Sequence, residues 1–85
     1  MSLIHDLCDT LARDVIAAMD ELGDDRFHEK ISKVLLDMSP TTQEIYNSAM
    51  RGLLAERKAR AFMQAALQAK REGRTGPTIH MDAGH

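Results

Sequence analysis

The chain contains one cysteine, Cys8, whose thiol would be a nucleophile if its surroundings favoured the thiolate. His5 stands three residues earlier, within reach on a helix. Asp6 and Asp9 surround the pair with negative charge, which disfavours a thiolate. Cys8 also falls among apolar residues such as Leu11. We therefore predict a buried structural thiol rather than a catalytic one.

Histidines and carboxylates are the other side chains that could hold a metal. His5 and Asp9 stand four residues apart, as do Asp24 and His28. Each pair would offer two ligands from one helix, whereas a metal site needs three or four that converge. His80 and His85 lie in a glycine-rich C-terminal stretch, and the acidic group at residues 20–25 lacks the spacing of a calcium-binding loop. We expect no metal site.

Other catalytic signatures are missing from the sequence. It has no glycine-rich phosphate loop, no zinc-protease motif and no paired cysteines. The few reactive side chains do not assemble into an acid–base pair or an activated nucleophile. The expectation is a protein that is not an enzyme and carries no cofactor.

The elements that would position these residues are helices. Apolar residues recur at three- and four-residue steps along three stretches, which is the period of one helix face. Ser2 is a suitable N-cap for the first helix, and Gly23 is a suitable C-terminal residue. Asp24 or Asp25 can cap the second helix, which ends before Pro40. The sequence predicts helices at about 2–22, 25–38 and 40–72.

Two starts are open for the third helix. Ser39 can cap it with Pro40 at the first helical position, or Thr41 can cap it with Glu44 closing a capping box. Good helix formers then continue to about residue 72. Gly52 weakens this prediction, because a break there would let residues 53–72 fold back as a fourth helix. We favour a continuous helix.

The predicted fold is all-α, a three-helix antiparallel bundle with a long third helix. Residues 1–72 would form a single helical domain. Residues 73–85 hold three glycines and one proline and show no apolar period. They are predicted to be a flexible, disordered tail.

Charge is divided along the chain. Residues 1–39 carry nine acids and four bases, a net charge of −5, whereas residues 51–74 carry seven bases and two acids, a net charge of +5. The basic stretch could neutralise acidic helices, or it could bind a polyanion such as nucleic acid. The residues that would bind the polyanion are Arg51, Arg57, Lys58, Arg60, Lys70 and Arg71.

The third helix would extend beyond the other two, because the first and second helices are only about 30 Å and 20 Å long. Its last part continues an apolar stripe, formed by Ala59, Phe62, Met63, Ala66 and Leu67. Leaving these side chains in water forgoes burial energy. A two-fold pairing of two copies would cover the stripe on both chains. We therefore predict a homodimer through these residues.

The leading functional hypothesis is a small non-enzymatic interaction or regulatory module that self-associates. The alternative is a nucleic-acid-binding regulator that uses the basic helix at residues 51–74. A protein partner other than a second copy fits the first hypothesis. No apolar run approaches a membrane span and no signal-peptide pattern opens the chain, so we expect a cytoplasmic protein with no membrane contact.

Overall fold

The computed structural model describes residues 2–79. It contains three helices, α1 (Leu3–Leu22), α2 (Phe27–Met38) and α3 (Pro40–Arg71), and no strand among the described residues. The all-α, three-helix prediction is confirmed. Helix α3 is the long helix that the sequence predicts, and it runs through Gly52 without a break.

Helix α1 has the two caps expected from the sequence. The backbone N–H of His5 donates to Ser2 Oγ at 3.2 Å, which satisfies one of the free donors of the first turn. Gly23 adopts the left-handed conformation at φ 66°, and the N–H of Asp24 donates to the carbonyl of Met19 at 3.1 Å. The chain therefore turns sharply after Leu22.

Helix α2 begins at Phe27, two residues later than predicted. Asp24 does not cap the helix itself. Its Oδ1 accepts a hydrogen bond from the N–H of Arg26 at 3.0 Å, which stabilises a turn before the helix. Arg26 occupies the N-cap position with no side-chain cap. The end of the helix at Met38, ahead of Pro40, is as predicted.

The start of α3 decides between the two caps that the sequence left open. Ser39 Oγ accepts the N–H of Thr42 at 3.1 Å, and the carbonyl of Ser39 accepts the N–H of Gln43 at 3.0 Å. Ser39 is therefore the N-cap and Pro40 the first helical residue.

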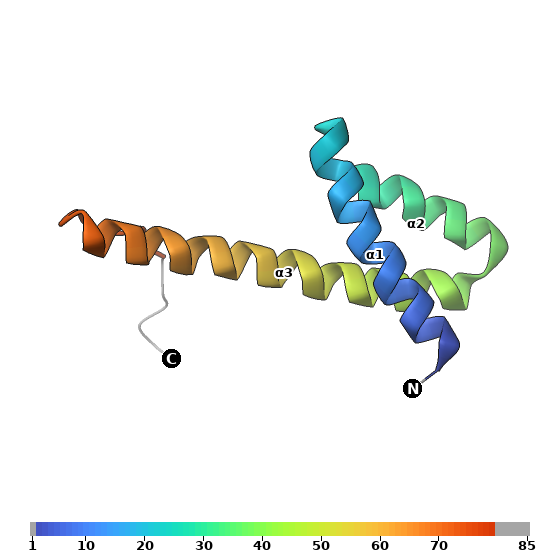
Figure 1. Ribbon diagram of the computed structural model, residues 1–85. Helices are drawn as coiled ribbons and strands as arrows, with labels where there is room; N and C mark the ends of the chain where they lie inside the picture. Colours follow the sequence, from blue (N-terminus) through green and yellow to red (C-terminus); the bar gives the residue numbers. More distant parts are fainter. Residues whose placement is uncertain (1, 80–85) are drawn as a thin grey trace. The chain divides into compact units, whose positions relative to one another are not determined.

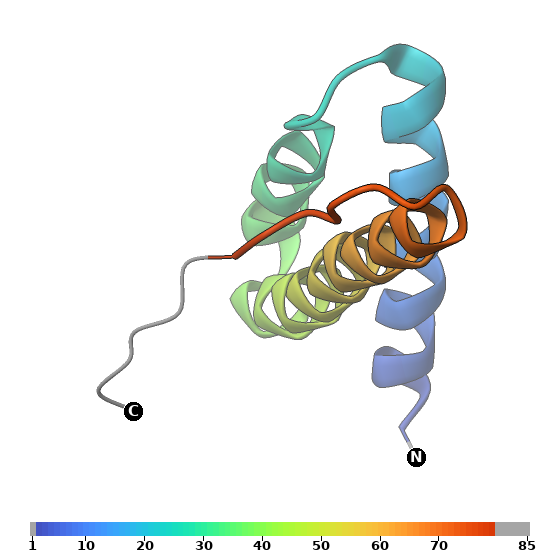
Figure 2. The same ribbon diagram turned by 90° about the vertical axis from the view of Figure 1, so that its left-hand side faces the viewer.

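The structure divides into two compact units between Ala55 and Glu56. The core of the first unit consists of Cys8, Ala12, Val15 and Met19 from α1 and Tyr46 and Met50 from α3. Phe27, Ile31 and Leu35 of α2 pack against it. Figures 1 and 2 show α1 crossing the first turns of α3, with α2 beside them.

Polar contacts fix α2 against α3 in this unit. The hydroxyl of Tyr46, which has no solvent exposure, donates to the carbonyl of His28 at 3.0 Å. Ser32 Oγ donates to Asn47 Oδ1 at 2.9 Å and accepts from Gln43 Nε2 at 3.1 Å. These bonds join polar groups at the half-buried boundary between the helices.

The second unit contains the C-terminal part of α3 and the residues after it. Gly73 takes the left-handed conformation at φ 68°. The N–H of Arg74 donates to the carbonyl of Ala69 at 2.8 Å, and the N–H of Gly73 to that of Lys70 at 3.2 Å. This Schellman pattern ends the helix and reverses the chain.

After this turn the chain crosses in front of the end of α3 (Figure 2) and folds back, so that Gly76 lies beside Ala66 and Ala69. We call residues 74–79 the return segment; it contains neither helix nor strand, as expected for the predicted tail. Residues 80–85 lie outside the described part of the chain. The flexibility of the tail and the domain limit at residue 72 stay predictions.

Candidate interaction surface

Cys8 lies in the core, with 2% of its surface exposed. Its Sγ is 3.7 Å from the carbonyl oxygen of Thr42. Burial, and secondly the charge of Asp9, raise the pKa of the thiol above its ordinary value. His5 Nδ1 instead shares a hydrogen bond with Ser2 Oγ. The prediction of a buried thiol is confirmed.

The two pairs of His and Asp considered as metal ligands each include a side chain with another partner: His5 bonds with Ser2, and Asp24 with Lys30. Asp24 Oδ2 accepts a hydrogen bond from Lys30 Nζ at 3.1 Å, and this bond, followed by that from Arg26, lowers the pKa of the Asp24 carboxyl. Within residues 2–79, no three His, Cys, Asp or Glu side chains gather closely enough to hold a metal ion. His80 and His85 lie outside the described residues.

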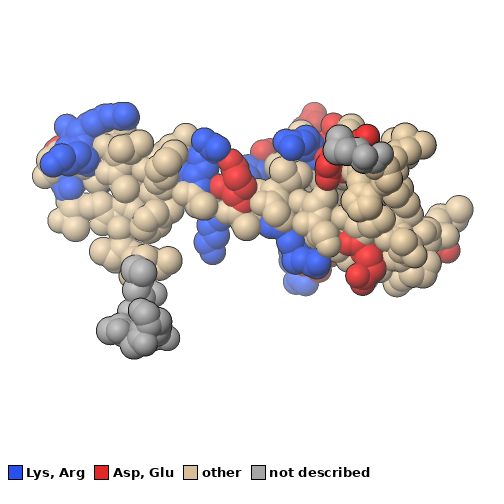
Figure 3. Space-filling view, turned by 90° about the horizontal axis from the view of Figure 1, so that it is seen from below, with Lys and Arg blue, Asp and Glu red and all other residues tan. Residues whose placement is uncertain are grey.

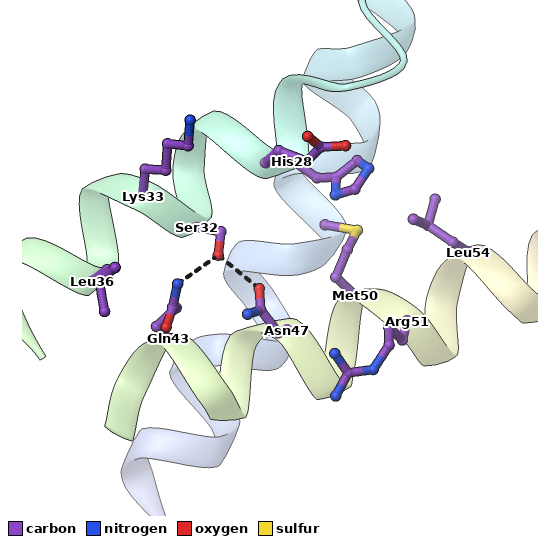
Figure 4. A pocket seen from close by; sticks show the side chains of 10 residues that line it. His28, Ser32, Lys33, Leu36, Gln43, Asn47, Met50, Arg51 and Leu54 are labelled. Carbon is purple, nitrogen blue, oxygen red and sulfur yellow. Dashed lines mark hydrogen bonds between the residues drawn. The ribbon is translucent and has the colours of Figure 1, made fainter. Parts of the chain in front are cut away.

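A groove of about 430 Å³ lies between α2 and the first half of α3. Figure 4 shows in its middle the hydrogen bond that Ser32 accepts from Gln43 and the one that it donates to Asn47. Leu36, Met50 and Leu54 supply apolar surface, and the rim carries His28, Glu29, Lys33 and Arg51. Sequence analysis missed this groove, because it depends on how α2 and α3 are paired.

The six predicted polyanion-binding residues are all exposed but belong to both units. Arg51, in the first unit, donates to Ser48 Oγ at 3.3 Å. Arg60, in the second, donates from Nε to Glu56 Oε2 at 2.9 Å, and this bond raises the already high pKa of its guanidinium. Figure 3 shows Lys and Arg gathered over the C-terminal end of α3, and acidic side chains beside basic ones elsewhere on this face.

The predicted dimer residues lie on one side of α3 in the second unit, and we call them the apolar stripe. Phe62, Met63 and Leu67 are 40%, 47% and 46% exposed. Ala59 is also exposed, whereas Ala66 is half-buried. Phe62 and Met63 are adjacent, and Leu67 follows Met63 by one turn, so this side of the helix exposes several large apolar side chains, a feature that is common at interaction sites.

The apolar stripe has a different helical register from the core residues of α3. Extending the register of Tyr46, Met50 and Leu53 by steps of three and four leads to Arg57, Arg60 and Gln64, which are polar. The stripe therefore does not follow the register of Tyr46, Met50 and Leu53. It is a second apolar surface on the same helix.

Comparison with protein-family models, with curated proteins and with solved structures found no match to this chain. None of the helices within residues 2–79 has the length and apolar character needed to cross a bilayer. The function is therefore inferred from the surface of the protein itself.

Proposed function

We propose that this chain is a small non-enzymatic helical interaction module that self-associates through the apolar stripe of α3. The exposure of Phe62, Met63 and Leu67 carries the proposal. A second copy is the partner we assign, because a two-fold pairing covers the same surface on both chains. A cytoplasmic location is part of the proposal, and the unpaired Cys8 fits a reducing compartment.

A binding role is favoured over a catalytic role by the state of the reactive groups. The thiol of Cys8 is buried, its pKa is raised, and it faces the backbone of Thr42. A nucleophilic cysteine needs the opposite environment, with partial exposure and a lowered pKa.

Sedimentation equilibrium at concentrations up to about 100 µM tests the proposal. We expect wild-type protein to dimerise and Phe62→Asp to give a monomer that stays helical by circular dichroism. Gln64→Asp is the matched control, since it places the same charge on the same exposed helix but outside the stripe. A wild type that stays monomeric, or a Phe62→Asp variant that still dimerises, contradicts the proposal.

The alternative is a nucleic-acid-binding regulator that uses residues 51–74. It is favoured by the exposure of all six predicted basic residues. Fluorescence anisotropy with a labelled duplex decides it, at about 50 mM salt and tens of micromolar protein. Binding that weakens steeply with salt would support this role, because cationic contacts release counterions. Absence of binding under these conditions removes it.

A further inference from the structure

We propose that the return segment, residues 74–79, is a displaceable cover that competes with a second copy of the chain for the C-terminal part of the apolar stripe. This inference rests on the self-association proposed above and concerns its regulation. The observations that carry it lie within the second unit of the structure.

The path of the chain brings the return segment back onto the helix. Gly73 supplies the left-handed conformation that the turn requires, at φ 68°. The bond from the N–H of Arg74 to the carbonyl of Ala69 then closes the turn. The residues that follow cross over the end of α3 (Figure 2), and Gly76 lies beside Ala66 and Ala69, so the chain has folded back onto the helix.

Gly76 is the point of contact. A Cβ atom placed on Gly76 would lie 3.5 Å from Ala66 Cα and 3.6 Å from Ala69 Cβ, so this backbone lies close beside the helix. Ala69 is only 1% exposed and is the one buried residue within residues 56–79. In this unit the return segment is the element that packs against it.

The return segment and the proposed dimer use the same alanine. Ala66 belongs to the apolar stripe and is half-buried by this contact, whereas Phe62, Met63 and Leu67 remain substantially exposed. A second helix that packs along the whole stripe must approach Ala66 closely. Two chains cannot occupy that space, so dimerisation along the whole stripe requires the return segment to move.

The contacts that hold the return segment on α3 are weak enough to allow such a movement. Glu72 Oε1 accepts a bond from Arg74 Nε at 2.6 Å, and Glu72 also accepts one from Gln68. The side chains of the Arg74–Glu72 pair are 58% and 44% exposed. Exposed ion pairs of this kind add little net stability. The cover is therefore held by a small apolar contact and a weak surface network.

A reversible disulfide between positions 69 and 76 tests the inference. The 3.6 Å between Ala69 Cβ and a Cβ at Gly76 falls within the roughly 3.5–4.5 Å that a disulfide requires. In the double variant Ala69→Cys/Gly76→Cys, oxidation should lock the cover in place. Cys8 is buried, and peptide mass mapping would verify that the new bond is intramolecular. The same protein after reduction is the matched control.

We expect the dimer dissociation constant from sedimentation equilibrium to rise at least tenfold on oxidation and to return on reduction. Gly73→Val tests the opposite change, in which the return segment is released instead of locked. A β-branched residue is strained at this left-handed position, so the turn should open and the dimer should become several-fold tighter. This variant decides the matter if the disulfide variant does not fold.

The outcomes separate the two proposals. If wild-type protein dimerises and neither locking nor opening the segment changes the dissociation constant, the cover is refuted while self-association stands. If locking strengthens the dimer, the return segment belongs to the interface and the competition is refuted. If no form dimerises, the self-association on which the inference rests has failed.

Discussion

At the scale of single residues, Tyr46 is the clearest example of a side chain that joins elements. Its ring is fully buried in the core, and its hydroxyl is bonded to the backbone of His28 in α2. A buried hydroxyl needs such a partner, because an unpaired polar group loses its hydration without compensation. One residue therefore contributes both to the apolar core and to the orientation of α2.

Removing that hydroxyl should weaken the fold modestly. We expect Tyr46→Phe to lower the free energy of unfolding by about 0.5–1.5 kcal/mol, the usual net contribution of one hydrogen bond. Urea unfolding followed by circular dichroism at pH 7 measures it. An unchanged free energy of unfolding would show that the bond to His28 contributes nothing to stability.

The same residue should affect stability at high pH. Burial raises the pKa of Tyr46 to about 12, from 10.0. The folded state therefore keeps its proton where the unfolded state has lost it, so this contribution is complete below about pH 10 and is lost towards pH 12. Between pH 9 and 12, the free energy of unfolding should fall more steeply for wild type than for Tyr46→Phe. Cys8 is present in both proteins, so their difference isolates Tyr46.

At the scale of elements, local signals predicted most helix ends. Ser2, Gly23 and Pro40 each act through their own backbone or a neighbour a few residues away, and the structure confirms their predicted roles. The predicted start of α2 was wrong by two residues, because Asp24 accepts a hydrogen bond within a turn and does not cap the helix. Sequence alone does not distinguish these two uses of an aspartate, since both are bonds to a nearby N–H.

The cap of α3 can be tested with a matched pair of variants. Ser39→Ala removes the oxygen that accepts the N–H of Thr42 and should cost about 1 kcal/mol of unfolding free energy. Thr41→Ala, two residues later, removes an exposed side chain that does not cap the helix and should change it by less than about 0.5 kcal/mol. The reverse order would place the cap at Thr41.

The continuity of α3 makes a prediction at Gly52. This residue is helical, and a Cβ added there meets nothing within 4 Å. Gly52→Ala should therefore raise the free energy of unfolding by about 0.5–1 kcal/mol. Gly23→Ala is the contrasting control, because its φ of 66° makes any side chain unfavourable. If Gly52→Ala also destabilised the protein in thermal melts, α3 would not be a regular helix at that point.

At the scale of the whole molecule, the apolar stripe could be predicted from the sequence and its cover could not. Steps of three, one, three and one residues place the apolar stripe, from Ala59 to Leu67, within one half of any helix. The contact of Gly76 with Ala66 depends on the direction in which the chain leaves Gly73, a tertiary property with no periodic signature. The groove between α2 and α3 was unpredictable for a similar reason.

Self-association should make thermal stability depend on concentration. Dimerisation that involves only folded chains stabilises the folded state by mass action. The melting temperature of wild type should therefore rise between about 5 and 200 µM, while that of Phe62→Asp should stay constant. Equal behaviour of the two proteins would argue against an interface at the stripe.

The place where α3 passes from one unit to the other has a consequence for amide hydrogen exchange. Backbone bonds continue to Arg71, but the core contacts of the helix end near Leu54. Amides near Tyr46 should exchange only by unfolding of the core, whereas those beyond Ala55 can open by local fraying. Protection of the backbone amides against exchange should therefore fall from the N-terminal to the C-terminal part of α3. High protein concentration should restore this protection selectively around Phe62, because dimerisation covers that part of the helix.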